Sequence, residues 1–109
     1  MDAQDFFSQI LERQSETDAL VNDFYRATCD FAEAQAIYDI EVANHTVNHK
    51  QKGTPATLIK DIIRGEVADA RKTMVIAEGA MKAADKRELN NRKMLTLLSA
   101  AVDKGWETV

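Results

Sequence analysis

Only one segment of this 109-residue chain is well suited to interrupt a helix, and this scarcity constrains the fold more than any other feature. The chain contains one proline and four glycines, and the proline closes the segment Lys52-Gly53-Thr54-Pro55. Residues that favour helices dominate on both sides of it, and no alternating strand pattern is present. We therefore expect a single all-α domain over residues 1–109, in which two long helices are separated by this break.

Capping residues predict where the helices begin and end. Ser15 is a suitable N-cap, which predicts a fresh helix start after a first short helix. Thr54 as N-cap with Pro55 at the first helical position predicts a second start. Gly65 then ends or bends the helix that follows. These signals predict short helices over residues 3–13 and 55–64 and long helices over residues 16–50 and 66–104.

Each long helix carries apolar residues at steps of three and four, which is the heptad pattern of packed helices. Helices of this length would be about 50–60 Å long, and a short connector makes them run antiparallel as a hairpin. The first stripe is Val21, Phe24, Thr28, Phe31, Gln35, Tyr38, Val42, His45 and His49. The second stripe is Val67, Ala70, Met74, Ala77, Met81, Ala84, Glu88, Asn91, Leu95, Leu98 and Val102.

A hairpin of two helices buries only one stripe on each, so the core of such a small chain is limited. The short helices add further apolar residues in the stretches 6–11 and 58–63. Exposed apolar surface of this kind usually meets a partner. We therefore expect a homo-oligomer in which self-association completes a helical bundle.

Charge is distributed unevenly along the chain, whose net charge is −4. Residues 1–41 carry ten acidic and two basic residues, a net −8, whereas residues 42–64 carry four basic and one acidic residue, a net +3. The overall acidity disfavours a general nucleic-acid binder. The positive segment in an acidic chain is therefore the local feature that most favours a site for an anion.

The sequence also bears on compartment. It has no apolar run of about 20 residues that could span a membrane. Its first residues are acidic where a signal peptide would be basic, and Cys29 has no second cysteine with which to form an internal disulfide. We expect a cytoplasmic protein that makes no contact with a membrane.

The positive segment is the candidate ligand-binding site. It places two lysines and a glycine directly before a helix N-terminus, where free N–H groups and the helix dipole favour an anion such as a small nucleotide. It is not a Walker loop, because the Gly-x-x-x-x-Gly-Lys spacing is absent. The alternative is an ordinary solvated connector before a capped helix. The candidate residues are Lys50, Lys52, Thr54, Thr57, Lys60 and Arg64.

Glu41, His45 and His49 are four residues apart and so lie along one helix face. Two imidazoles one turn apart can share a metal ion with a carboxylate. The chain has no further histidine, however, and we favour hydrogen-bonded histidines at the end of the stripe, with no metal and no cofactor. No nucleophile is spaced to work with a base, so we expect no catalytic residues and no enzyme activity.

Two further surfaces suggest alternatives to a small ligand. The acidic first long helix, with Asp23, Asp30 and Glu33, could mimic nucleic acid and occupy a basic groove of a host protein. A stripe of basic residues on the last helix could follow a nucleic-acid backbone, although pairing with the acidic helix is the favoured use. That stripe consists of Arg71, Lys82, Lys86 and Lys93.

The stretch from Lys52-Gly53-Thr54-Pro55 through Arg64-Gly65-Glu66, followed by a helix rich in Ala, Glu and Lys, resembles small helical proteins encoded by temperate bacteriophages. The resemblance implies an accessory protein that acts by binding in the host cytoplasm. Such proteins block a host defence protein, sequester a signalling nucleotide, or assist replication or recombination. The hypothesis that follows is a non-enzymatic inhibitor of host defence that binds an anionic nucleotide at residues 49–64.

Overall fold

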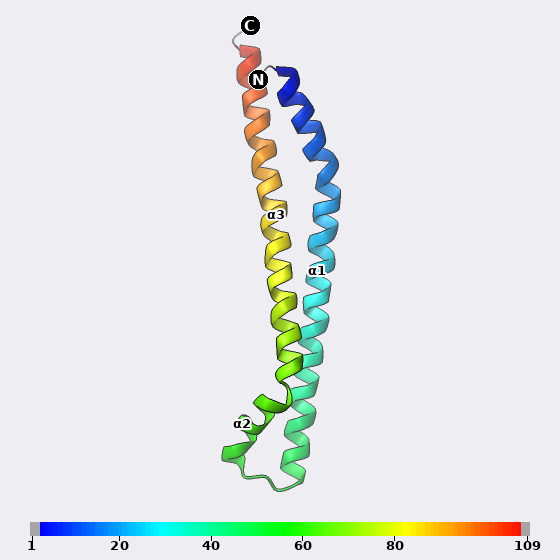
Figure 1. The fold of residues 1–109 in the computed structure, drawn as a ribbon, viewed down its shortest axis with the longest axis vertical. Coiled ribbons are helices and arrows are strands. Elements are labelled where there is room, and N and C mark those ends of the chain that lie inside the picture. Colours follow the sequence, from blue (N-terminus) through cyan, green and yellow to red (C-terminus); the bar gives the residue numbers. More distant parts are fainter. Residues whose placement is uncertain (1–2, 108–109) are drawn as a thin grey trace. The chain divides into compact units, whose positions relative to one another are not determined.

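The chain folds into three α-helices. The computed structural model describes the backbone of residues 3–107 and the side chains of residues 4–104. Within this part of the chain, the helices are α1 (Ala3–Gln51), α2 (Ala56–Glu66) and α3 (Ala68–Glu107), and no strand is present (Figure 1). The prediction of an all-α protein is confirmed. Across the same residues, no helix has a stretch apolar and long enough to cross a membrane.

The helices contribute to two compact units. Unit 1 comprises the described residues up to Arg26 together with those from Lys82 onward, and unit 2 comprises Ala27–Met81. In each unit a part of α1 lies beside a part of α3, and the two parts run in opposite directions (Figure 1). Unit 2 also contains all of α2.

Unit 1 has a polar residue within its apolar seam. Asn91 is only 4% exposed, and its amide nitrogen donates hydrogen bonds to the Arg13 carbonyl oxygen (3.3 Å) and the Thr17 hydroxyl (3.1 Å). Sliding one helix along the other would break both bonds in an apolar surrounding. Asn91 therefore fixes the level at which the two helices of this unit face each other.

α1 continues through Ser15, so the predicted break between a short and a long helix is wrong. The Ser15 hydroxyl donates to the Glu12 carbonyl oxygen (2.6 Å) and does not cap a new helix. The Thr17 hydroxyl similarly donates to the Arg13 carbonyl oxygen (3.0 Å). Serine and threonine can bond back to their own helix in this way. With no glycine or proline nearby, nothing interrupts the helix.

The predicted stripe of α3 is confirmed, since every one of its positions is buried or half-buried. The stripe of α1 is confirmed in part. Val21, Thr28 and Gln35 are exposed, and their neighbours Leu20, Ala27 and Ala34 are covered in their place. Both patterns share the aromatic residues Phe24, Phe31 and Tyr38. Between them the predicted stripe takes a step of four and then a step of three, whereas the structure takes three and then four. The order adopted places small alanines in the seam and leaves polar Thr28 and Gln35 in water.

The break between α1 and α2 differs in detail from the prediction. Gly53 has φ +77°, a backbone conformation that favours glycine. The N-cap of α2 is Pro55 (φ −56°, ψ 133°), with no side-chain capping bond, so the assignment of Thr54 as the cap is wrong. The Thr54 hydroxyl instead forms a hydrogen bond of 3.2 Å with His49 Nδ1. That side chain therefore joins the connector to the end of α1.

The bend between α2 and α3 lies at Val67 rather than at Gly65. α2 continues to Glu66, and Val67 (φ −102°, ψ 13°) separates it from α3. Val67 is 2% exposed and forms a core cluster with Ile59 and Ile63, against which Tyr38 and Val42 of α1 pack. Burial of a β-branched side chain, and not the flexibility of glycine, therefore places the bend.

Candidate functional site

A groove of about 600 Å³ lies between α1 and α2 in unit 2, and we call it the basic groove. Its floor is the outer surface of the core cluster and is apolar. The two walls come from the last turns of α1 and from α2 with the start of α3. The floor consists of Tyr38, Val42, Ile59, Ile63 and Val67, while Thr46 and Ala56 complete the lining between the charged side chains.

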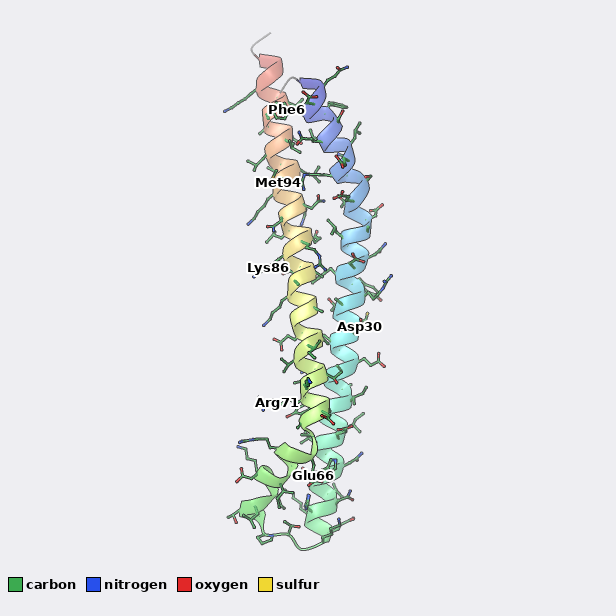
Figure 2. All side chains as sticks on the ribbon, viewed as in Figure 1. Phe6, Asp30, Glu66, Arg71, Lys86 and Met94 are labelled. Atoms are coloured by element: carbon green, nitrogen blue, oxygen red, sulfur yellow. The ribbon has the colours of Figure 1, made fainter. Side chains whose placement is uncertain are left out.

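Four cationic side chains line this groove. Lys50 comes from α1, Lys60 and Arg64 come from α2, and Arg71 comes from the start of α3 (Figure 2 labels Arg71). Among the residues that the structure describes, none of the four forms an ion pair or a side-chain hydrogen bond. Four positive charges around one apolar groove repel one another, and an anion bound there would relieve this repulsion.

The structure brings together three of the six predicted site residues. Lys50, Lys60 and Arg64 line the basic groove, whereas Lys52, Thr54 and Thr57 do not. Lys52 follows the last turn of α1, and Thr54 is bonded to His49. The candidate site therefore moves from the connector to the space between the two helices.

Arg71 belongs to the groove but was not predicted as part of it. Its sequence signal is its distance of seven residues from Arg64, since Lys60, Arg64 and Arg71 follow a helical spacing of four and seven. The prediction instead assigned Arg71 to a basic stripe on the last helix. The bend at Val67 explains the difference, because it brings the start of α3 beside α2.

A second group of polar side chains lies on another side of α1, and we call it the His–Glu cluster. His45 Nδ1 lies 2.7 Å from Glu66 Oε2, and His49 Nε2 bonds to the other oxygen of the same carboxylate. Figure 2 shows Glu66 at the end of α2, beside α1. Through its second nitrogen, His49 also reaches Thr54. One carboxylate thus links two turns of α1 to the bend between α2 and α3.

The electrostatics of the cluster favour the ionised carboxylate. The hydrogen bond from His49 holds the pKa of Glu66 below its ordinary value, and the charges of His49 and His45 act in the same direction. Partial burial opposes this shift but does not outweigh it. Within the cluster, the ionised carboxylate of Glu66 therefore accepts hydrogen bonds from both histidines.

The two histidines are hydrogen-bonded at the end of the stripe, as predicted, but their carboxylate partner is Glu66 and not Glu41. Glu66 is 17 residues beyond His49 and lies on another helix, so no spacing in the sequence links them. Among the side chains that the structure describes, no group of three or more His, Cys, Asp or Glu is arranged to hold a metal ion.

Glu66 also lines a second groove of about 540 Å³, which we call the acidic groove. Glu41 and Asp69 add two further carboxylates, and His45 is the basic side chain in the lining. No residue lines both grooves. His45 and Thr46 are consecutive and so point about 100° apart around α1. The two grooves consequently lie on different sides of the same helix.

The lining of the basic groove suits binding better than chemistry. Its hydroxyl groups belong to Tyr38 and Thr46, and the Thr46 hydroxyl donates to the Val42 carbonyl oxygen at 2.7 Å. Neither histidine lines this groove, and its charged lining consists of Lys50, Lys60, Arg64 and Arg71. The groove supplies positive charge and apolar surface, which are the means of holding a ligand.

Comparison of the chain with known protein families, with curated proteins and with solved structures gave no match.

Proposed function

We propose that this protein is a non-enzymatic binding protein that takes up a small anionic ligand in the basic groove. The observation that carries this proposal is the set of four cationic side chains around the groove, none of which has an acidic partner among the described residues. Unpaired cations reduce the stability of the fold through mutual repulsion, and a bound anionic ligand would offset this repulsion.

The biological setting that we propose is a bacteriophage accessory protein. The sequence resembles small helical phage proteins, some of which inhibit host defence by sequestering a signalling nucleotide. A groove that combines positive charge with an apolar floor is consistent with such a ligand. On this proposal, the protein acts in the cytoplasm of the host by removing the nucleotide from solution.

The binding test compares residues on the groove with a matched residue outside it. The double variant Lys60→Ala/Arg64→Ala is expected to bind ADP at least about 100-fold more weakly than the wild type, because each of the two charge-assisted bonds contributes about 1.5–3 kcal/mol. Lys52→Ala/Lys93→Ala is the matched control, since it removes two positive charges from exposed lysines that do not line the groove. Isothermal titration calorimetry gives both affinities.

Equal loss of affinity in the control and in the double variant would show that overall charge, and not the groove, attracts the anion. In cells, expression of the wild type is expected to restore phage plaques on a host whose defence depends on a nucleotide signal. The double variant is expected to lose this effect and the control to keep it. If the double variant also restored phage plaques, inhibition of host defence would not depend on the groove.

A second candidate function is inhibition of a host protein through the acidic face of α1. Asp23, Asp30 and Glu33 are all exposed, as a nucleic-acid mimic requires. A charge-neutral triple variant, Asp23→Asn/Asp30→Asn/Glu33→Gln, is expected to abolish inhibition on this alternative and to preserve it on the leading proposal. A role in DNA or RNA metabolism through Lys86 and Lys93 is the third alternative, and Lys82 of that stripe already has an interaction partner.

We also propose that the long helices form one antiparallel hairpin that completes a bundle by self-association. Large apolar side chains with more than half of their surface exposed support this proposal, among them Phe7, Leu11, Tyr25, Ile76 and Leu97. Light scattering at micromolar concentration is expected to give a mass above that of the 12.2 kDa chain. A stable monomer would contradict self-association.

A further inference from the structure

We infer that the ligand of the basic groove is an organic anion with an apolar body, which lies on the groove floor while at least two negative charges meet the rim. This inference rests on the proposed anion-binding function and adds the chemical class of the ligand. Two kinds of ligand share this chemistry, namely nucleotides and alkyl phosphates.

The floor argues for an apolar body. It is the outer surface of the core cluster, formed by Ile59, Ile63 and Val67 with Tyr38 and Val42 packed against them. The groove encloses about 600 Å³. This volume lies within the range of about 300–1,000 Å³ that is typical of sites for small organic molecules. An inorganic anion would engage only the rim and would leave the apolar floor covered by water, without the gain from burying it.

The rim argues for more than one negative charge. Lys60 and Arg64 are one helical turn apart on α2, and Arg71 lies beyond the bend on the same side of the groove. Lys50 projects from the opposite wall, which is formed by α1. Charges spread along one wall and across the groove are matched by a ligand with several anionic oxygens. The two arginines can each bond two such oxygens at once.

The first test compares ligands that differ in the body. ADP and dodecyl phosphate each carry anionic phosphate on an apolar body, whereas pyrophosphate carries charge alone. In calorimetric titrations of the wild type, at least one of the two body-bearing probes is expected to bind ten or more times as tightly as pyrophosphate. Preference for ADP over dodecyl phosphate would assign a planar ring system, and the opposite preference would assign an alkyl chain.

The second test changes the apolar surface without changing charge. Val42→Ala removes two methyl groups from the floor and is expected to weaken the preferred body-bearing probe about tenfold, with pyrophosphate unchanged. Thr46→Leu adds apolar surface beside Val42 and is expected to strengthen the same probe a few-fold. The Thr46 hydroxyl donates to the carbonyl oxygen of Val42 in its own helix, so its loss breaks no bond between helices among the described residues. Circular dichroism checks the fold of both variants.

The outcomes separate this inference from the proposed function. If pyrophosphate and the body-bearing probes bind equally, and all are lost in Lys60→Ala/Arg64→Ala, the anion site stands and the apolar body is wrong. If no probe binds the wild type in a groove-dependent manner, both proposals fail. Insensitivity of the preferred probe to both Val42→Ala and Thr46→Leu would likewise overturn the inference, because the floor would then not contact the ligand.

Discussion

Unit 2 has two grooves with charged side chains, which are paired with one another in one groove and unpaired in the other. At the acidic groove, Glu66 bonds to His45, which lines the same groove, and to His49, which lies one turn further along α1. In the basic groove, the cationic side chains have no acidic partner among the described residues. Charges that meet inside the chain hold its helices together. Charges that remain unmatched are available to a ligand.

This difference has an energetic consequence. Removing the Glu66 carboxylate takes the shared ionic partner from two half-buried histidines, which costs stability. Removing a cation from the basic groove relieves repulsion and costs little, since exposed charges contribute little to the fold. Substitutions in the acidic groove should therefore affect mainly the melting temperature, and substitutions in the basic groove should affect mainly binding.

The largest expected effect comes from Val67, which belongs to the core cluster and to the floor of the basic groove. Val67→Asp would bury a carboxylate in the core cluster at a position that is 2% exposed in the wild type. The expected loss of unfolding free energy is about 3–5 kcal/mol, because the charge has no partner there. Thermal unfolding followed by circular dichroism measures it, and ligand binding should disappear as well. A melting temperature unchanged from that of the wild type would show that the bend does not support unit 2.

The next effect should be confined to the basic groove. Arg64→Glu/Arg71→Glu replaces two cations by anions and is expected to weaken ADP binding by more than 100-fold, since two charge-assisted bonds of about 1.5–3 kcal/mol each are lost. The melting temperature should change by no more than a few degrees. Lys52→Glu/Lys93→Glu lowers the net charge by the same amount at exposed residues outside the groove and is the control. A large drop in melting temperature for the arginine variant would mean that the unmatched charges are structural after all.

The fold was predictable from the sequence to a large extent, for identifiable physical reasons. The lack of helix breakers gave the helices, and the stripe of α3 gave its covered face. The break at Ser15 was wrong because a capping side chain can also bond back to its own helix. The bend was placed at Gly65 instead of Val67, because burial of Val67 depends on α1 packing against α2, which no local signal reports.

The candidate site was predictable only in part. Lys50, Lys60 and Arg64 share a short positive segment, so local charge identified them. Arg71 and Glu66 lie on either side of the bend, and their contributions depend on how α2 turns into α3. Local charge also suggested Lys52, which lies in the same segment but outside the groove. The position of the charged residues in the sequence therefore identified the candidates. Which of them line the groove depends on how the helices pack.

A smaller effect is expected when the matched charges are broken. Glu66→Gln keeps the shape of the side chain but removes the negative charge that both histidines share. The melting temperature is expected to fall by a few degrees, while the affinity for ADP stays within about threefold, because Glu66 does not line the basic groove. The matched control is Glu41→Gln, which lines the same acidic groove but bonds to neither histidine in the structure. A similar fall in both variants would assign the effect to overall acidity.

The smallest expected effect is a pH dependence that Glu66→Gln should remove. The pKa of Glu66 is lowered in the folded protein, chiefly by the hydrogen bond from His49. A carboxylate with a lowered pKa stabilises the folded state fully above the ordinary glutamate pKa of about 4.3, and this contribution is lost as pH falls through the folded-state pKa. The difference in unfolding free energy between the wild type and Glu66→Gln should therefore shrink as pH falls below that ordinary value.

Subtracting the variant removes the titration of carboxylates common to both proteins, including Glu41 and Asp69 of the same groove. Urea unfolding at several pH values between about 3 and 5 measures the difference around the ordinary glutamate pKa, below the range in which histidine side chains ionise. A difference that grows as pH falls would reverse the sign and show that the folded state favours protonated Glu66. The contact between Glu66 and the two histidines would then not stabilise the fold. The contrast between stabilising charge pairs in the His–Glu cluster and unpaired charges in the basic groove would then not hold.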